Sequence, residues 1–339
     1  MAVDLGLGGL YPAKEVIRAV LEPKEGETKS ILDLGCGTGT WAIEMAREYP
    51  DAEVLGIDLA PVPVDGDTLP SNCRFEVDNI NLGLAHFGGQ FDVVHIRFVG
   101  SGLQNFKERM KDVHNCLKPG GIVIWVDADF DYYSTEKFEY HLPATDDNPG
   151  GCWSQRVVSE MRRACLRIGS DPIGMESELD AGLWTDPLID PETCKTGSLY
   201  LPVGTWASHD NPRVAPLLKY VGALIGQDFI GAMKLIVPLM VKVGWTKNDV
   251  EMWRRNLIQE LTDLHVHTVL RVRLVWGRRR PISEGRSVEQ ASDTEARPDS
   301  PSRVSYPWFY VYDTEEVSLK QAEARKKGKN NSILPPIPS

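Results

Sequence analysis

The stretch ILDLGCGTGTW, residues 31–41, indicates the fold more strongly than any other part of the chain. It begins as a short apolar run, passes through glycines at alternate positions and leads into a segment with helical spacing. Glycines let the backbone turn tightly and let a ligand approach without meeting a Cβ. The first turn of the following helix offers backbone N–H groups that lack partners within the helix. The stretch therefore predicts a strand, a ligand-binding loop and a helix in succession.

Further apolar runs follow this stretch and alternate with helical patterns. The runs are short and rich in β-branched residues, and they cover residues 53–57, 73–77, 91–95 and 122–126. Helical spacing appears between them, at Thr40–Tyr49 and Asn105–Leu117. Such alternation is typical of buried parallel strands joined by right-handed crossovers. The predicted fold class is α/β, with a doubly wound and mostly parallel sheet.

The chain divides into five predicted segments. They are an N-terminal helical segment at 1–29, a Rossmann-like ligand-binding core at 30–135, a helical region with one strand at 136–268, a final strand at 269–281, and a flexible linker with a C-terminal extension at 282–339. The helical region is expected to cover the acceptor site. The extension contains an aromatic island, Tyr306–Tyr312, that we expect to pack back onto the body, with a partner-binding motif as the alternative.

Composition limits the classes of function. The 339 residues include 37 Lys and Arg against 48 Asp and Glu, a net charge of −11, so a polyanion finds little general attraction and no nucleic acid is expected as a partner. No run of 18 apolar residues occurs, so we expect no membrane span or membrane partner. The N-terminus does not resemble a secretory signal, and none of the six cysteines forms a C-x-x-C pair. These features predict free thiols, a cytoplasmic protein and no metal site.

The spacing of the loop helps to identify its ligand. The third glycine comes one residue too early for the G-x-G-x-x-G pattern of dinucleotide enzymes. Asp33 lies just before Gly35, and a carboxylate suits an ammonium group better than a pyrophosphate. Acidic residues also close two later runs, where Asp58 can accept ribose hydroxyls and Asp78 with Asn79 can recognise an adenine edge. An amino-acid-bearing nucleoside such as S-adenosylmethionine fits this set.

These motifs together resemble the class I S-adenosylmethionine-dependent methyltransferases, and most closely the fungal LaeA-like group. The resemblance is carried by LDLGCGTGTWAIEMAREYPDAEVLGIDLAPV at 32–62, FDVVHIRFVGS at 91–101 and LKPGGIVIWVDAD at 117–129. It continues through LPVGTWASH at 201–209 and VWGRRRP at 275–281. It implies a seven-stranded sheet, S-adenosyl-L-methionine as cofactor and S-adenosyl-L-homocysteine as product.

The resemblance also implies positions for the cofactor. Asp33, Gly35, Gly37 and Gly39 would line its methionine and ribose side, and Asp58 would hold the ribose. Leu59 would touch the adenine, Asp78 and Asn79 would hold the adenine edge, and His95 and Arg97 would lie near the methyl group. Cys36, Thr38, Trp41 and Ile80 complete the expected cofactor-binding set.

The acceptor is harder to infer. The expected function is in-line transfer of a methyl group to a small-molecule acceptor, to an oxygen of an apolar secondary metabolite that is either a carboxylate or a hydroxyl. The catalytic candidates are His95, Asp129 and His209, and Asp127, His141 and Trp206 are further acceptor-site candidates. Structural roles stay open for each, such as a hydrogen-bonded core histidine. The alternative function is a LaeA-like regulator that acts through a protein partner or as a homodimer. The cluster Arg278–Arg280 is then either a solvated strand end or a nuclear address.

Overall fold

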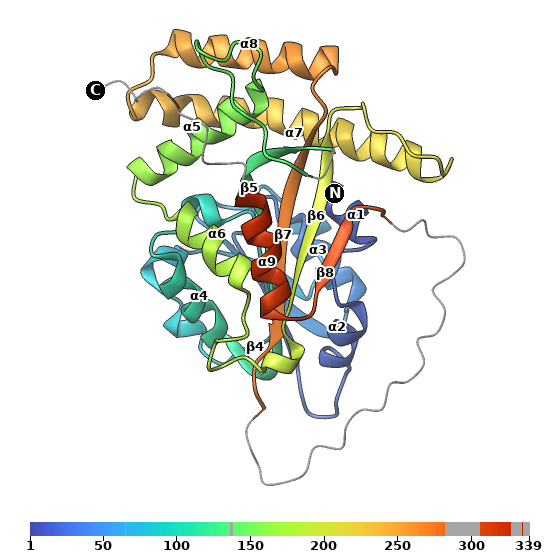
Figure 1. The fold of residues 1–339 in the computed structure, drawn as a ribbon. Coiled ribbons are helices and arrows are strands. Elements are labelled where there is room, and N and C mark those ends of the chain that lie inside the picture. Colours follow the sequence, from blue (N-terminus) through green and yellow to red (C-terminus); the bar gives the residue numbers. More distant parts are fainter. Residues whose placement is uncertain (65, 136–137, 282–305, 327–333, 335–339) are drawn as a thin grey trace.

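The computed structural model describes residues 1–64, 66–135, 138–281, 306–326 and 334. Within them, one sheet has the strand order β3-β2-β1-β4-β5-β7-β6-β8 (Figure 1). The strands are β1 Lys29–Leu34, β2 Ala52–Asp58, β3 Cys73–Val77, β4 Phe91–Arg97, β5 Leu117–Ser134, β6 Lys195–Val203, β7 Thr268–Arg278 and β8 Phe309–Tyr312. Strands β1 to β5 run parallel, whereas β7, β6 and β8 pair antiparallel. The doubly wound, mostly parallel sheet is confirmed, and its C-terminal part is mixed.

Helices cover the sheet and extend beyond it. They are α1 Ala2–Leu7, α2 Lys14–Val20, α3 Thr40–Glu48, α4 Phe106–Asn115, α5 Trp153–Arg167, α6 Pro172–Ala181, α7 Val214–Lys242, α8 Lys247–Asp263 and α9 Glu315–Lys326. Short 3-10 turns lie at Gly66–Thr68 (η1), Ile80–Leu82 (η2), Ala85–Phe87 (η3), Gly100–Gly102 (η4) and Pro191–Thr193 (η5). The segment predicted as a helical cover, 136–268, contains α5 to α8 and β6.

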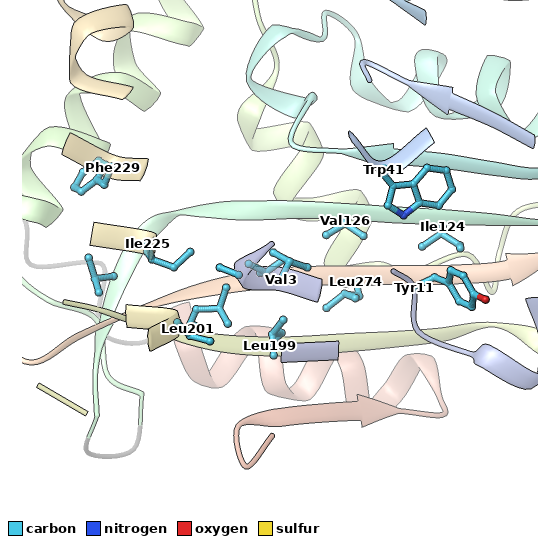
Figure 2. Packing of buried hydrophobic residues seen from close by; sticks show 14 of the residues in the cluster. Val3, Tyr11, Trp41, Ile124, Val126, Leu199, Leu201, Ile225, Phe229 and Leu274 are labelled. Atoms are coloured by element: carbon cyan, nitrogen blue, oxygen red, sulfur yellow. The ribbon is translucent and has the colours of Figure 1, made fainter. Parts of the chain in front are cut away.

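Alternate residues of the central strands serve two separate cores. Ile31, Val54 and Val93 face one core, to which α1, α2 and α3 contribute. Figure 2 shows Val3 of α1 and Trp41 of α3 among its residues. Their neighbours Leu32 and Leu55 face the other core, which α4 and α6 complete. Each fully buried aliphatic side chain stabilises the fold by about 1.5–3 kcal/mol. Burial on both faces explains why these strands are continuous apolar runs in the sequence.

Helix α8 has a capping pair at its start, and helix α7 has a proline in its interior. The capping pair of α8 is reciprocal, because the Asp249 N–H donates to Thr246 Oγ1 and the Thr246 N–H to Asp249 Oδ2. Helix α7 is 29 residues long and contains Pro238, which removes a backbone donor from its interior.

No single described helix is long and apolar enough to span a membrane. Only the two arms of α7, Val214–Lys234 and Ile236–Lys242, which are bent by 43°, meet both requirements together.

The C-terminal extension adds a strand to the sheet. Strand β8 pairs with β6 in the register Ser198 to Tyr310, and the Tyr200 N–H donates to the Trp308 carbonyl at 2.9 Å. Tyr306 is buried, and its hydroxyl donates to the Tyr200 carbonyl at 2.9 Å. The aromatic island thus packs onto the body, and the expected count of seven strands is wrong by one. The sequence predicts a flexible linker in the first part of the segment 282–339. Residues 282–305 of that segment lie outside the described residues.

The cluster Arg278–Arg280 is tied to the end of the sheet. Arg278 Nε donates to the Gly120 carbonyl at 3.0 Å, Arg279 Nη1 to the Leu117 carbonyl, and Arg280 Nε to the Pro187 carbonyl at 3.3 Å. These guanidinium groups satisfy carbonyls of neighbouring turns. The contacts favour the strand-end interpretation of the cluster.

Candidate active site

The glycine loop joins β1 to α3 in a conformation that its sequence requires. Gly35 and Gly37 have φ of 68° and 58°, in the left-handed region that residues with a Cβ seldom adopt. A Cβ on Gly35 would lie 2.5 Å from Val99 Cγ2, so the loop packs closely against the residues after β4. A Cβ on Gly37 would meet nothing within 4 Å, so the backbone there is open to a ligand. Cys36 is partly buried and Thr38 is exposed beside it.

Two carboxylates stand at the ends of the neighbouring strands. Asp58 Oδ2 accepts the Gly37 N–H at 2.8 Å, and Oδ1 accepts the Ala60 N–H at 3.1 Å. Asp78 Oδ1 accepts the Asn79 N–H at 2.7 Å, and its Oδ2 lies 2.8 Å from His86 Nε2. A carboxylate has about four acceptor positions, so each of these groups keeps capacity for ligand hydroxyls or amines.

A pocket of about 230 Å³ brings many of the expected cofactor residues together. Of that set, Gly35, Asp58, Leu59, Asp78, Asn79 and Ile80 line it. It lies at the carboxyl ends of β1 to β4, where doubly wound sheets bind their ligands. Leu59 is 69% exposed, so its side chain is accessible to a ligand in the pocket.

Other expected residues lie outside this lining because they are buried. Asp33 and His95 are 2% and 1% exposed, and Asp33 Oδ1 lies 2.8 Å from His95 Nδ1 across the β1–β4 pair. The Trp41 ring stacks on His95 at 3.7 Å between centroids, and Trp41 Nε1 donates to the Leu10 carbonyl. Burial lowers the pKa of His95, although the Asp33 carboxylate opposes this shift. Asp33, the expected ammonium partner, thus holds His95 through one of its two carboxylate oxygens.

Arg97 is also occupied by protein. Its Nη1 lies 2.7 Å from Asp4 Oδ1 on α1, which fixes the N-terminal helix to the end of β4. Both side chains remain partly exposed, at 20% and 23%. Arg97 is not among the residues that line the pocket.

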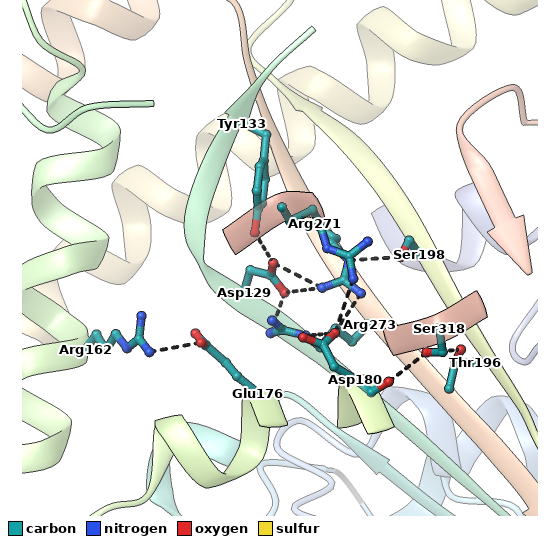
Figure 3. Close-up of polar contacts among 11 residues, drawn as sticks. Asp129, Tyr133, Arg162, Glu176, Asp180, Thr196, Ser198, Arg271, Arg273 and Ser318 are labelled. Atoms are coloured by element: carbon teal, nitrogen blue, oxygen red, sulfur yellow. Dashed lines mark hydrogen bonds and ion pairs between the residues drawn. The ribbon is translucent and has the colours of Figure 1, made fainter. Parts of the chain in front are cut away.

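The catalytic candidates do not converge. Asp129 is buried between Arg271 and Arg273, with Arg273 Nη1 at 2.5 Å from its Oδ1 and the Tyr133 hydroxyl donating to its Oδ2 (Figure 3). Burial opposes ionisation of Asp129, but these guanidinium groups outweigh it and hold its pKa below the usual value. His209 lies on an exposed loop, where its Nδ1 accepts the Asn211 N–H at 3.0 Å. Together with the buried His95, these residues occupy three separate environments.

Among the further candidates, Asp127 has the clearest link to the pocket. Its Oδ2 accepts the Gly100 N–H at 2.7 Å and its Oδ1 the Ala128 N–H at 2.9 Å. Burial raises the pKa of Asp127 to about 6, against the effect of these N–H donors and of Arg273. The carboxylate therefore holds the turn after β4. His141 and Trp206 instead contact His267, through its carbonyl and its ring respectively.

The turn after β4 contributes residues that sequence reasoning missed. Phe98, Val99, Ser101, Gly102 and Leu103 line the pocket, as does Asn81. Their sequence, an apolar pair followed by Gly100-Ser101-Gly102, directly continues the β4 motif and was the available signal. The predicted set included His95 and Arg97 at the end of this strand but not the residues that follow them.

Comparison with known proteins gives consistent results. Residues 11–167 match a family model described as a methyltransferase domain. The chain is 37% identical over 277 residues to the secondary metabolism regulator LAE1 of Cochliobolus heterostrophus, a match that covers 81% of this chain and 82% of that protein. It is 30% identical over 272 residues to the secondary metabolism regulator laeA of Coprinopsis cinerea, covering 80% of this chain. It is 28% identical over 248 residues to methyltransferase str2 of Strobilurus tenacellus, covering 70% of this chain and 78% of that protein. The chain spans 64% of the length of the Coprinopsis cinerea protein.

Proposed function

The chain belongs to the LaeA-like group of class I S-adenosylmethionine-dependent methyltransferases, whose cofactor is S-adenosyl-L-methionine, and on this premise we propose that it transfers a methyl group to an oxygen of a small apolar molecule. The observation that carries the proposal is the pocket at the carboxyl ends of β1 to β4. There a glycine loop open to ligand lies beside Asp58 and Asp78.

The residues of this pocket fit the cofactor by their chemistry. Gly35 lines the pocket, and Gly37 on the same loop, whose N–H donates to Asp58, would meet nothing within 4 Å of an added Cβ, so a ligand can approach the backbone there. Asp58 and Asp78 are fixed by backbone N–H groups and keep acceptor capacity, which suits ribose hydroxyls and an adenine amino group. Leu59 offers an apolar surface for a flat base between these polar groups.

The chemistry itself needs position more than acid or base. When bound, the cofactor would supply an electrophilic methyl group: the acceptor oxygen would form the new C–O bond as the S–C bond breaks, the electron pair would stay on sulfur, and any hydroxyl proton would be lost to bulk solvent after the transfer. The protein orients the reactants and excludes water from them. Asp127 contributes by holding the Gly100 turn that forms one wall of the pocket.

A regulatory role is the second candidate. It is supported by two relatives that are named as regulators of secondary metabolism. The same pocket would then bind cofactor, and the protein would act through a partner.

The proposal is tested by calorimetry followed by an acceptor screen. We expect S-adenosyl-L-methionine and S-adenosyl-L-homocysteine each to bind with a stoichiometry of about one, and labelled methyl to move to a member of a panel of phenols, fatty acids and amines. Absence of heat and of thermal protection with both nucleosides would exclude the proposal. Binding without transfer to any acceptor would favour the regulator.

A further inference from the structure

We propose that the wall of the pocket formed by Phe98, Val99 and Leu103 is the acceptor site, and that it selects a neutral, planar, apolar hydroxyl compound through Phe98. This inference rests on the proposed methyl transfer and adds the acceptor class to it.

The backbone at Phe98 is held in an unfavourable conformation. Its φ is 59°, a region where a bulky residue is a genuine outlier. Its N–H donates to the Val126 carbonyl at 2.9 Å, which fixes this geometry at the end of β4. Glycine or asparagine adopts the same conformation at lower cost. Local folding therefore does not account for a phenylalanine at this position.

The Phe98 ring does not serve the core either. It is 46% exposed, although every residue from Phe91 to Ile96 on the same strand is buried. In the part of the chain that the structure describes, Phe98 belongs to none of the hydrophobic clusters. Its neighbour Val99, by contrast, packs against the second core and the glycine loop. The ring is thus available to a ligand in the pocket that it lines.

The charged groups of the pocket lie on one side, beside Leu59 and Ile80, and three apolar side chains lie on the other side with Ser101. Its polar groups, Asp58, Asp78 and Asn79, follow β2 and β3, and they suit the nucleoside of the cofactor. The side that follows β4 carries the apolar Phe98, Val99 and Leu103. An aromatic ring at the wall favours a planar partner, because offset stacking adds to the burial of apolar area.

The charge of the pocket selects the reacting group. Its lining contains the carboxylates of Asp58 and Asp78 and no lysine, arginine or histidine. Apart from the sulfonium of the bound cofactor, a carboxylate acceptor would find no cationic partner in the lining and would lie close to like charges, which disfavours it. A neutral hydroxyl has no such penalty, and Ser101 on the same wall can accept or donate a hydrogen bond to it.

A matched pair of probes tests both parts of the proposal. Calorimetry with saturating S-adenosyl-L-homocysteine compares 2-naphthol with 2-naphthoic acid at neutral pH, where they differ in charge but share the ring system. We expect the wild type to bind 2-naphthol at least about tenfold more tightly. Phe98→Asn keeps the left-handed backbone and should weaken 2-naphthol about tenfold, while the affinity for the nucleoside stays within about twofold.

Two further variants separate the acceptor wall from the cofactor site. Leu82→Asn changes an apolar residue that is 83% exposed on the neighbouring turn but outside the lining, and should alter neither affinity. Leu59→Asn should weaken the nucleoside instead of 2-naphthol. Equal binding of the two probes, no binding of either one, or a loss of nucleoside affinity in Phe98→Asn as large as the loss of 2-naphthol would overturn the assignment. If the wild type does not bind S-adenosyl-L-homocysteine, the proposed function is wrong. The affinities for 2-naphthol and 2-naphthoic acid are then compared without the nucleoside, so that the acceptor assignment is tested separately.

Discussion

The two halves of the sheet place their carboxylates in opposite settings. In the parallel half, Asp58 and Asp78 end their strands, are partly exposed and accept backbone N–H groups. In the antiparallel half, Asp129 and Asp180 are buried against Arg271 and Arg273 (Figure 3). A carboxylate held by backbone amides keeps its charge available to a ligand, whereas one enclosed by guanidinium groups serves charge balance. The same residue type therefore indicates binding in one half and stability in the other.

The strongest way to break this comparison is to remove Asp180. It contacts Arg271 Nη2 at 3.0 Å, Arg273 Nε at 3.1 Å and Arg325 Nη2 at 3.4 Å, and it is 3% exposed. Asp180→Ala removes an ion-pair partner from three cations, of which Arg271 and Arg273 keep Asp129, and should lower the free energy of unfolding by about 3–5 kcal/mol in urea titration. The exposed pair Lys195–Asp313 is the matched control, since Asp313→Asn should cost less than about 1 kcal/mol. If the two variants lose similar free energies of unfolding, the buried cluster contributes no more to stability than an exposed ion pair does.

Removal of Asp58 should have the opposite profile. Asp58→Ala loses charge-assisted hydrogen bonds to the cofactor, worth about 3 kcal/mol together, so affinity for S-adenosyl-L-homocysteine should fall roughly 100-fold by calorimetry. Stability should change by only about 1 kcal/mol, because the side chain is partly exposed. Glu76→Ala, at an exposed position on β3, is the control and should leave affinity unchanged. If Asp58→Ala unfolds the protein without a selective loss of affinity, the distinction between the halves fails.

Asp127 lies between the two halves and makes stability depend on pH. Its folded pKa of about 6 lies above the ordinary 3.8, so the stabilising contribution of the protonated form is fully present below pH 3.8 and is lost as the pH rises through 6. The loss amounts to about 3 kcal/mol between these limits. Asp127→Asn cannot ionise, so its unfolding free energy should rise relative to wild type by about 3 kcal/mol between pH 3 and 8. Parallel pH profiles for the two proteins, measured by urea titration, would rule the effect out.

The smallest expected effect concerns the C-terminal extension. Arg325 on α9 reaches Asp180, whose other two cationic partners remain when Arg325 is changed. Arg325→Gln should therefore lower the free energy of unfolding by about 1.5 kcal/mol and leave nucleoside affinity unchanged. Lys326→Gln on the same helix is the control and should be neutral. A Lys326→Gln loss as large as that of Arg325→Gln would argue against the ion pair as the anchor.

The sequence predicted those residues of the candidate site whose position depends on a local feature, either the backbone conformation of a turn or the end of a strand. Gly35, Gly37 and Asp58 follow directly from a local pattern, and all lie where the pattern predicts, around one loop. Asp33 and His95 occur in equally suggestive positions, but they face each other across β1 and β4 and satisfy each other. Asp129 lies just beyond the run 122–126 that predicted this strand, as a candidate base would, but it is part of β5, and its arginines come from β7, far along the chain.

Local order along the chain was sufficient for the parallel strands, the glycine turn and the cofactor they imply, because apolar runs, alternate glycines and helix caps act within a few residues of one another. Long-range packing was needed for the pairing of Asp33 with His95, the added strand β8 and the exposure of Phe98. Each of these depends on which distant group fills the space beside a side chain, and that space exists only once the strands have assembled.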